Sequence, residues 1–268
     1  MRIVAIFAVY NEERFIERSV RHLYEQGVES YVIDNESSDA TRRIVEGLRG
    51  RGVVGVETLP RGGVFELTRQ LRRKERLHRE LGADWYLHHD ADEFRQAPNP
   101  HRTLAEGIEA VDRSGYNAID FDEFVFMPTD EEPDFDHDRF FEEMQHYLYF
   151  APMQPWRVNA WKNVGQTIDL VSMGGHQVRF RGRKLYPQRF ILRHYLALSV
   201  QHAERKYCGR TYHQREIEHG WHGRRATLEP GRIYLPPRAQ LKKLAPDNTW
   251  NTAEPWNEEP LFKLARPP

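Results

Sequence analysis

The sequence is poor in cysteine and carries almost no net charge. Cys208 is the single cysteine among 268 residues, which excludes an internal disulfide framework and any zinc site built from cysteines, and is typical of a reducing compartment. The 39 Lys and Arg residues nearly balance the 40 Asp and Glu residues, so the net charge is −1. No overall basic field draws the chain to nucleic acid or anionic lipid, and we expect no nucleic-acid partner.

Long apolar runs are also missing. A membrane-spanning helix needs about 18 or more consecutive apolar residues. The most apolar stretch near the start, 3–9, is too short even for the core of a signal peptide. We therefore expect a cytoplasmic protein without a membrane span. Aromatic residues make up 12% of the chain, which argues against disorder, and a chain of 268 residues can bury a large core.

Strand and helix patterns alternate along the first hundred residues. Apolar runs rich in β-branched residues predict strands at 2–9, 30–33, 53–58 and 85–89. Between them, apolar residues recur at helical spacing, which predicts three helices. Strands separated by helices indicate an α/β fold with a doubly wound, mostly parallel sheet.

Polar side chains follow three of these predicted strands. Tyr10 and Asn11 come after the first strand, Asp34 after the second and Asp90 after the fourth. Ligands of doubly wound sheets bind beyond the carboxyl ends of the strands. We therefore expect these four side chains to converge on one ligand site.

The alternation is lost after residue 100. The pattern there predicts a helix at 103–114, a strand at 117–126, an acidic loop at 130–138 and further strands near 177–180 and 189–192. Such a mixture indicates an α+β arrangement.

Proline is concentrated at the end of the chain. Eight of the 16 prolines lie between Pro230 and Pro268, which predicts an extended arm that wraps the body or lies on a partner chain. We therefore expect 1–100 and 101–228 to form two halves of one domain and 229–268 to form the arm. Through this arm the protein would form a homodimer.

Asp90 and Asp92 form the strongest local signal. An apolar strand delivers two carboxylates, spaced i and i+2, on a single turn. Such oxygen ligands suit Mg²⁺ or Mn²⁺, which keep open positions for water and for the phosphate oxygens of a substrate. A solvated acidic turn is the usual alternative for such a pair, but its place after the fourth strand favours a metal site.

Three segments resemble the nucleotide-sugar-binding half of glycosyltransferase family 2, which has the GT-A fold. They are VAIFAVYNEE at 4–13, VIDNESSDAT at 32–41 and DADE at 90–93. Their order and spacing make them specific together, and the resemblance extends over roughly the first 95 residues.

The resemblance implies a role for each of these side chains. Asp34 would accept a hydrogen bond from the nucleotide base, and the first strand exit at Val9 and Tyr10 would pack against that base. Asp92 would ligate the metal directly, while Asp90 would face the ribose or the water shell of the metal. The sequence departs from the commonest family pattern at two positions, since Asn35 and Glu36 stand where a second Asp and a Gly are usual.

The resemblance further implies an inverting transfer of a sugar from a UDP-, GDP- or dTDP-sugar to an acceptor hydroxyl. The acceptor would be a glycan, a lipid-linked glycan or a small molecule. Such a transfer needs a general base, and we expect Asp169, beside the glycine pair at 174–175, to be that base. Its alternative role is that of a turn or helix cap, and Glu123 and Asp122 are the competing bases.

Two histidines and one arginine complete the candidate site. His176 and His194 are candidates for a third metal ligand, since GT-A enzymes often add a C-terminal histidine to the Asp pair, although a hydrogen-bonded structural role is the more common one for either histidine alone. The basic helical stretch before the metal strand contains Arg72, Arg73 and Lys74, and one of them, for which we choose Arg73, would reach the nucleotide phosphates. The solvated face of a helix is the alternative for that stretch.

Two other functions compete with glycosyl transfer. A sugar-nucleotidylyltransferase shares the superfold but usually has a glycine-rich, arginine-containing loop after the first strand, where this chain has AVYNEE at 8–13. A non-catalytic module that binds glycans or nucleotides would share the fold as well. The intact Asp34, Asp90 and Asp92 favour the enzyme.

Overall fold

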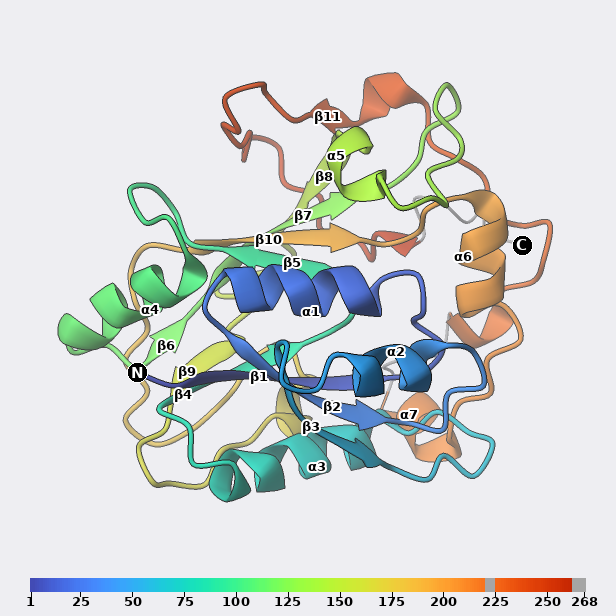
Figure 1. Cartoon of the computed structure of the whole chain (residues 1–268). Helices are drawn as coiled ribbons and strands as arrows, with labels where there is room; N and C mark the ends of the chain where they lie inside the picture. The colour runs from blue at the N-terminus through green and yellow to red at the C-terminus, as the bar shows by residue number, and fades with distance from the viewer. Residues whose placement is uncertain (220–224, 262–268) are drawn as a thin grey trace. The chain divides into compact units, whose positions relative to one another are not determined.

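The structure, a computed structural model, describes residues 1–219 and 225–261. Its first sheet has six strands in the order β3-β2-β1-β4-β9-β6 (Figure 1). These strands are β1 (Ile3–Val9), β2 (Glu29–Asp34), β3 (Val53–Thr58), β4 (Trp85–His89), β6 (Ala118–Ile119) and β9 (Ala160–Lys162). The first four pair in parallel, and β9 pairs antiparallel with β4 and β6. The predicted α/β fold with a mostly parallel sheet is therefore confirmed.

Helices cover both faces of the parallel strands. They are α1 (Ile16–Glu25), α2 (Thr41–Gly47) and α3 (Leu67–Glu80). The chain steps from β1 to β2 to β3 in one direction and then returns to the other side of β1 for β4. Because such crossovers are right-handed, α1 and α2 lie on one face and α3 on the other (Figure 1). The order reverses between β1 and β4, which is where sheets of this kind open a ligand crevice.

The second sheet has five strands in the order β11-β8-β7-β10-β5. They are β5 (Glu93–Gln96), β7 (Phe121–Phe126), β8 (His146–Phe150), β10 (Phe190–Tyr195) and β11 (Lys242–Lys243). The remaining helices are α4 (Leu104–Arg113), α5 (Phe140–Glu143), α6 (Val200–Tyr207) and α7 (Gln214–Glu218), with short 3₁₀ helices η1 (Val171–Met173), η2 (Arg225–Thr227) and η3 (Arg238–Gln240).

Contacts within the chain define two compact units. The first consists of Met1–Gly62, Glu66–Asp122 and Pro155–Leu192, and the second of Gly63–Phe65, Glu123–Gln154 and the chain from Arg193 onward. All strands of the six-stranded sheet and α1 to α4 belong to the first unit.

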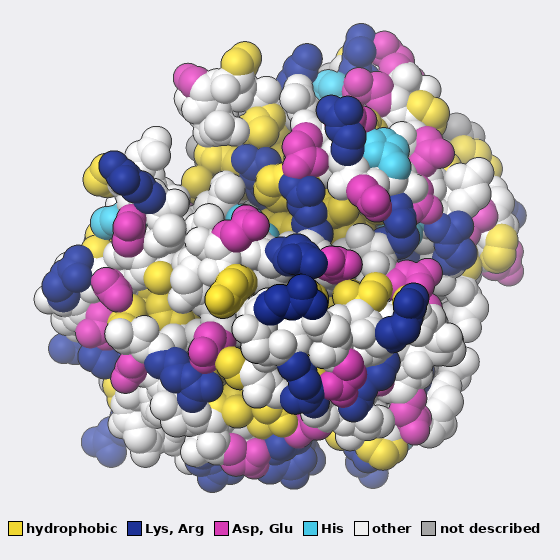
Figure 2. Space-filling model, in the orientation of Figure 1, with side chains coloured by type: hydrophobic (Ala, Val, Ile, Leu, Met, Phe, Trp, Pro, Cys, Tyr) yellow, Lys and Arg dark blue, Asp and Glu magenta, His cyan; other side chains and the backbone are white. Residues whose placement is uncertain are grey.

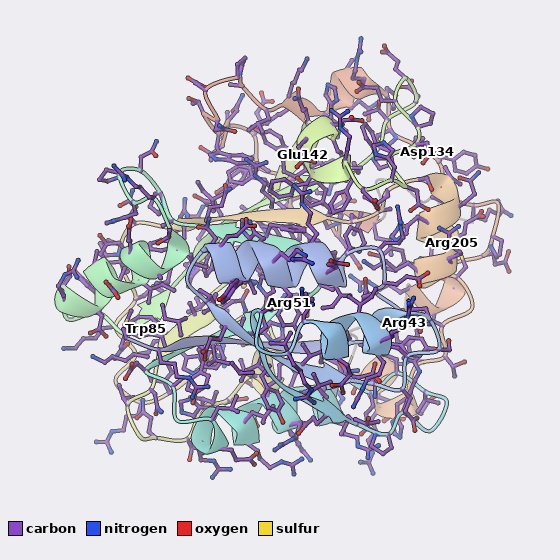
Figure 3. The ribbon with its side chains drawn as sticks, viewed as in Figure 1. Arg43, Arg51, Trp85, Asp134, Glu142 and Arg205 are labelled. Carbon is purple, nitrogen blue, oxygen red and sulfur yellow. The ribbon has the colours of Figure 1, made fainter. Side chains whose placement is uncertain are left out.

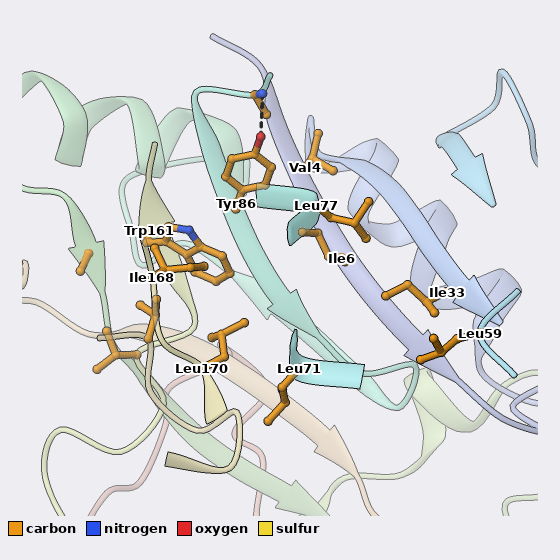
Figure 4. Close-up of a cluster of buried hydrophobic side chains, with 14 residues drawn as sticks. Val4, Ile6, Ile33, Leu59, Leu71, Leu77, Tyr86, Trp161, Ile168 and Leu170 are labelled. Atoms are coloured by element: carbon orange, nitrogen blue, oxygen red, sulfur yellow. Dashed lines mark hydrogen bonds between the residues drawn. The ribbon is translucent and has the colours of Figure 1, made fainter. Parts of the chain in front are cut away.

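The core of the first unit lies between α3 and the sheet. Val4 and Ile6 of β1 pack with Leu71 and Leu77 of α3, and all four are buried (Figure 4). Alternate residues of β1 face this layer because successive side chains of a strand point to opposite faces. The opposite side chains are buried too, so β1 is apolar on both faces, as the central strand of a doubly wound sheet is expected to be.

Two polar contacts connect α4 to the sheet. Trp85, labelled in Figure 3, is fully buried at the start of β4, and its indole N–H donates to Asp112 Oδ1 of α4 at 2.8 Å. The Lys162 Nζ of β9 lies 2.8 Å from the same oxygen. On the outside, basic and acidic side chains are interspersed over the face seen in Figure 2, as the near-zero net charge leads one to expect.

The predicted strand near 177–180 is wrong. This segment forms only isolated bridges, with Val158 and Asp169. Gly175 and Gly182, with φ of 83° and 76°, turn the chain on either side of the segment.

The strand predicted at 117–126 is divided into β6 and β7 at Asp120. The Asp120 carboxylate accepts a hydrogen bond from the Arg157 backbone N–H at 2.8 Å, and burial raises the pKa of Asp120 to about 6.

Little regular structure follows α7. Residues 225–261 contain η2, η3 and the two-residue strand β11, and the last part of the predicted arm, 262–268, lies outside the described residues. Across the described ranges, every helix is too short or too polar to cross a membrane.

Tyr86 supports the chain reversal that precedes β4. Its hydroxyl oxygen accepts the Ala83 backbone N–H at 2.9 Å, and both residues are buried (Figure 4). Replacing Tyr86 with Phe leaves that N–H without its acceptor, which we expect to lower the free energy of unfolding by about 1–3 kcal/mol. Urea denaturation measures the loss, and the control Tyr234→Phe, at an exposed position, should change stability little. Equal stabilities of the two variants would contradict this account.

Candidate functional site

The carboxyl ends of β1, β2 and β4 lie at one edge of the six-stranded sheet. In the parallel register, Val9 pairs with Asp34, and Phe7 pairs with His89. Tyr10 and Asp90, which directly follow β1 and β4, therefore lie at the same edge as Asp34. This arrangement brings together side chains that are up to 80 positions apart in the sequence.

Asp34 is held as a buried carboxylate at the end of β2. Only 4% of the residue is exposed, and its Oδ1 accepts the Ser37 backbone N–H at 3.2 Å. The Arg42 Nη1 lies 4.0 Å from Oδ2. The half-buried ring of Tyr10 carries the Arg61 guanidinium 3.6 Å above its centroid. Asp34 and the stacked pair thus present an acceptor and a flat surface near one strand edge.

Asn11 holds the loop that follows Asp34. Its Oδ1 accepts the Ser38 backbone N–H at 2.8 Å, and its own backbone N–H donates to Ser37 Oγ at 3.0 Å. Asn11 has a φ of 56°, in the left-handed region that asparagine tolerates better than most residues. The structure thus gives Asn11 a part in positioning the loop.

The two departures from the family pattern have separate explanations. Glu36 has a φ of 60°, the backbone conformation for which glycine is the usual residue, and its Oε2 accepts the Arg61 N–H at 2.7 Å. Asn35 is buried, with its amide donating to the Leu59 carbonyl at 2.8 Å and its Oδ1 accepting from Gln70 at 2.9 Å. The turn therefore keeps a left-handed residue although no glycine is present.

Glu93 closes the turn that carries Asp90 and Asp92. The Glu93 N–H donates to the Asp90 carbonyl at 3.2 Å, and its Oε2 accepts the Asp90 N–H at 3.4 Å. The Asp90 side chain is half exposed, at 48%, whereas Asp92 is 7% exposed. Asp90 is therefore the more accessible of the two carboxylates.

Two arginines neutralise the buried Glu93 carboxylate. The Arg95 Nη2 lies 2.7 Å from Oε2, and the Arg157 Nη1 lies 3.8 Å from Oε1. Arg95 also contacts the His89 ring and Asn159. Burial lowers the pKa of Arg95, but the neighbouring carboxylate opposes that effect.

Lys74 of α3 contacts the end of β4 and lies close to Asp90. It is 1% exposed, and its Nζ lies 3.2 Å from His88 Nδ1, 3.2 Å from the His89 carbonyl and 4.0 Å from Asp90 Oδ1. Burial lowers the pKa of Lys74 to about 8, which leaves the amine protonated at neutral pH.

His88 and His89 are both buried and neutral. Burial, and then the neighbouring cations, lower the pKa of each imidazole well below its ordinary value. Because the Lys74 ammonium can only donate, His88 Nδ1 is the acceptor, and its Nε2 carries the proton 3.8 Å from Asp90 Oδ1. Gly175 lies over this ring, since a Cβ added there would stand 3.0 Å from His88 Cε1.

His176 and His194 have protein partners on their Nδ1 atoms. Arg157 Nη1 donates to His176 Nδ1 at 3.0 Å, and Trp156 stacks on the His176 ring at 4.3 Å between centroids. In the second unit, His194 Nδ1 lies 2.7 Å from Oε1 of Glu123, a carboxylate that is 1% exposed. This distance and burial describe a carboxylate that orients an imidazole.

The donor set of the Asp90–Asp92 turn fits a divalent cation only in part. Throughout 1–219 and 225–261, no three His, Cys, Asp or Glu side chains are grouped as a metal site built by the protein alone would require. Mg²⁺ and Mn²⁺ are commonly held by one or two carboxylates, with water and substrate phosphates as the other ligands. The two aspartates therefore fit an ion that shares its coordination with a bound diphosphate.

Asp169 caps η1. Its carboxylate accepts the Ser172 N–H at 2.9 Å. Partial burial acts to raise the pKa of Asp169, but the hydrogen bonds from Ser172 and Val171 outweigh it and lower the pKa. Asp122, the other competing base, is paired with Arg189 at 2.6 Å.

Arg73 forms ion pairs with two neighbouring carboxylates. Its guanidinium binds Glu57 at 2.6 Å and Glu80 at 2.8 Å, and hydrogen bonds to these two residues raise its pKa. The basic residue that the helix directs toward Asp90 is the next one, Lys74. Its position three residues from both Leu71 and Leu77, on the apolar side of α3, is the sequence signal that identifies it as buried.

A comparison with protein families finds a match in the N-terminal part of the chain. The model of the family "Glycosyl transferase family 2" matches residues 4–64. No curated protein sequence matches the chain.

Several solved structures are similar at low sequence identity. The structure of S. aureus TarS 1-349 is 14% identical, with a TM-score of 0.44, over 73% of this chain and 60% of that chain. Its complex with UDP-GlcNAc is 14% identical, with a TM-score of 0.43, over 73% and 58%. The Mycobacterium tuberculosis glucosyl-3-phosphoglycerate synthase, in complex with Mn²⁺, UDP and phosphoglyceric acid, is 20% identical, with a TM-score of 0.31, over 46% and 43%.

The chain thus spans about 60% of the length of the TarS fragment. The family match includes Tyr10, Asn11 and Asp34, and it covers the strands that bring them to one sheet edge. Over residues 4–64, the resemblance of this chain to glycosyltransferase family 2 is confirmed.

Proposed function

We propose that the protein is an inverting glycosyltransferase that moves a sugar from a nucleoside-diphosphate sugar to an acceptor hydroxyl. The observation that carries the proposal is the common sheet edge of the buried Asp34 and the Asp90-Ala91-Asp92 turn. The first suits a nucleotide base and the second suits a diphosphate with its cation. The donor would be a UDP-, GDP- or dTDP-sugar, and the acceptor a glycan, a lipid-linked glycan or a small molecule.

The base would lie between Tyr10 and Asp34. A buried carboxylate accepts the N–H groups of a nucleotide base, and a hydrogen bond to a charged acceptor is stronger than one between neutral groups. The Tyr10 ring, backed by the Arg61 guanidinium, supplies a flat surface for the base. Asn11 supports this surface by holding the loop after Asp34.

Asp90 and Asp92 would hold Mg²⁺ or Mn²⁺ together with the diphosphate. When bound, such an ion neutralises negative charge on the departing diphosphate. Glu93 keeps the two carboxylates in place because it closes the turn and is itself neutralised by Arg95 and Arg157.

The proton of the acceptor hydroxyl needs a base, for which Asp169 and Glu123 are the candidates. Asp169 accepts hydrogen bonds from the first turn of η1, and these lower its pKa. Glu123 is buried, and its Oε1 lies 2.7 Å from His194 Nδ1. Asp169 is the first candidate for the base and Glu123 the second.

The first test uses nucleotide binding. UDP, GDP and dTDP are added to the protein with and without Mn²⁺, and the rise in melting temperature is measured. We expect one of them to stabilise the protein only when Mn²⁺ is present, and Asp92→Asn to abolish this stabilisation and most of the transfer activity without lowering the melting temperature of the free protein. Glu109→Gln on the surface of α4 is the matched control. Normal turnover of Asp92→Asn would refute the metal assignment.

Asp34 is tested through the donor KM. Asp34→Ala should raise the KM for the nucleotide sugar by roughly 10- to 150-fold, the equivalent of about 1.5–3 kcal/mol, with a smaller change in kcat, because the base does not react. Asp34→Asn separates binding from loop structure, since its carbonyl oxygen can still accept the Ser37 N–H. A fall in kcat at unchanged KM would show that Asp34 has another role.

The base is tested by three variants compared under the same conditions. We expect Asp169→Asn to lower kcat by roughly a hundredfold to ten-thousandfold, and Glu123→Gln and His194→Gln to lower it far less, while metal-dependent nucleotide binding stays unchanged in all three. If Glu123→Gln shows the large loss instead, Glu123 is the base.

A further inference from the structure

Lys74 is a buried cation with an unusual set of neighbours. Its Nζ donates to His88 Nδ1 and to the His89 carbonyl, each at 3.2 Å, and faces Asp90 Oδ1 at 4.0 Å. The residue is 1% exposed, and Leu71 and Leu77, on the same side of α3, are buried as well. The ammonium is therefore held beside Asp90 by the packing of the helix.

Cations of the protein already lie beside the turn. Arg95 and Arg157 contact the Glu93 carboxylate. Lys74 is the cation that faces Asp90.

A divalent cation at Asp90 would add two positive charges beside the Lys74 ammonium. Because Lys74 is buried, solvent screens the repulsion between the added ion and this ammonium only in part. A diphosphate bound at the same turn would bring negative charge of its own and would offset that repulsion.

We propose that Lys74 is a built-in counter-ion of Asp90 that keeps the Asp90–Asp92 turn from holding Mn²⁺ or Mg²⁺ until a nucleoside diphosphate is bound. This inference rests on the proposed function, and it deepens it by assigning an order in which metal and nucleotide bind. Lys74 acts here as a residue that sets metal affinity, and the transfer chemistry itself does not require it.

Mn²⁺ titration followed by electron paramagnetic resonance tests the proposal directly, because free Mn²⁺ is measured without any turnover. The wild-type protein should bind Mn²⁺ at least tenfold more weakly without nucleotide than with the nucleoside diphosphate that stabilises it. Lys74→Met should bind Mn²⁺ at least tenfold more tightly than wild type when no nucleotide is present. Arg73→Met, at the adjacent position but paired with Glu57 and Glu80, is the matched control and should leave that affinity unchanged.

Further variants assign the effect to Asp90. Adding Asp90→Asn to Lys74→Met should remove the gain in Mn²⁺ affinity, and Lys74→Gln replaces Lys74→Met if the latter does not fold. Two results would overturn the inference. One is an equal Mn²⁺ affinity of the wild type and the Lys74 variants without nucleotide. The other is a wild-type Mn²⁺ affinity that is as high without nucleotide as with it. Failure of every nucleoside diphosphate to bind would instead overturn the proposed function, while the effect of Lys74 on Mn²⁺ alone would still be measured.

Discussion

The buried ion cluster around Glu93 is the constraint on which the candidate site depends. Glu93 is 1% exposed, so its charge is tolerated only because Arg95 and Arg157 lie beside it. The same carboxylate binds the Asp90 N–H, and the Glu93 N–H binds the Asp90 carbonyl. The half-exposed Asp90 therefore lies on a turn whose conformation is fixed by the buried Glu93.

The two histidines at the end of β4 also support this turn. Both are neutral: His88 accepts from Lys74, and His89 contacts Arg95. His176 likewise has Arg157 as its partner. In the proposed function, an ion at the Asp90–Asp92 turn would take its other ligands from the substrate and water.

The sequence was sufficient to predict the sheet and the edge at which its polar residues meet. Apolar runs mark β1 to β4, and the rule for doubly wound sheets then brings Tyr10, Asp34 and Asp90 together. The sequence was not sufficient to decide which basic residue of α3 approaches Asp90. The carboxylates that bind Arg73 lie on β3 and at the end of α3, and only the three-dimensional structure shows that they contact Arg73. The spacing of Leu71 and Leu77 around Lys74 was a sequence signal that Lys74 is buried.

Pairings across long sequence separations were harder still. Glu123 and His194 are both conspicuous in the sequence, one as a base and the other as a metal ligand, yet their contact at 2.7 Å joins positions 71 residues apart. It follows from the neighbouring order of β7 and β10, which the sequence pattern after residue 100 does not specify. The strand predicted at 177–180 is wrong, because this segment, flanked by two left-handed glycines, forms only isolated bridges.

A crystal structure with the nucleoside diphosphate sugar and Mn²⁺ bound tests the central claim most directly. The account predicts the base against Tyr10 with an N–H directed to Asp34, and the ion between the diphosphate and the Asp90–Asp92 turn. A nucleotide bound away from the carboxyl ends of β1, β2 and β4, or a diphosphate that does not approach Asp90 and Asp92, would contradict it.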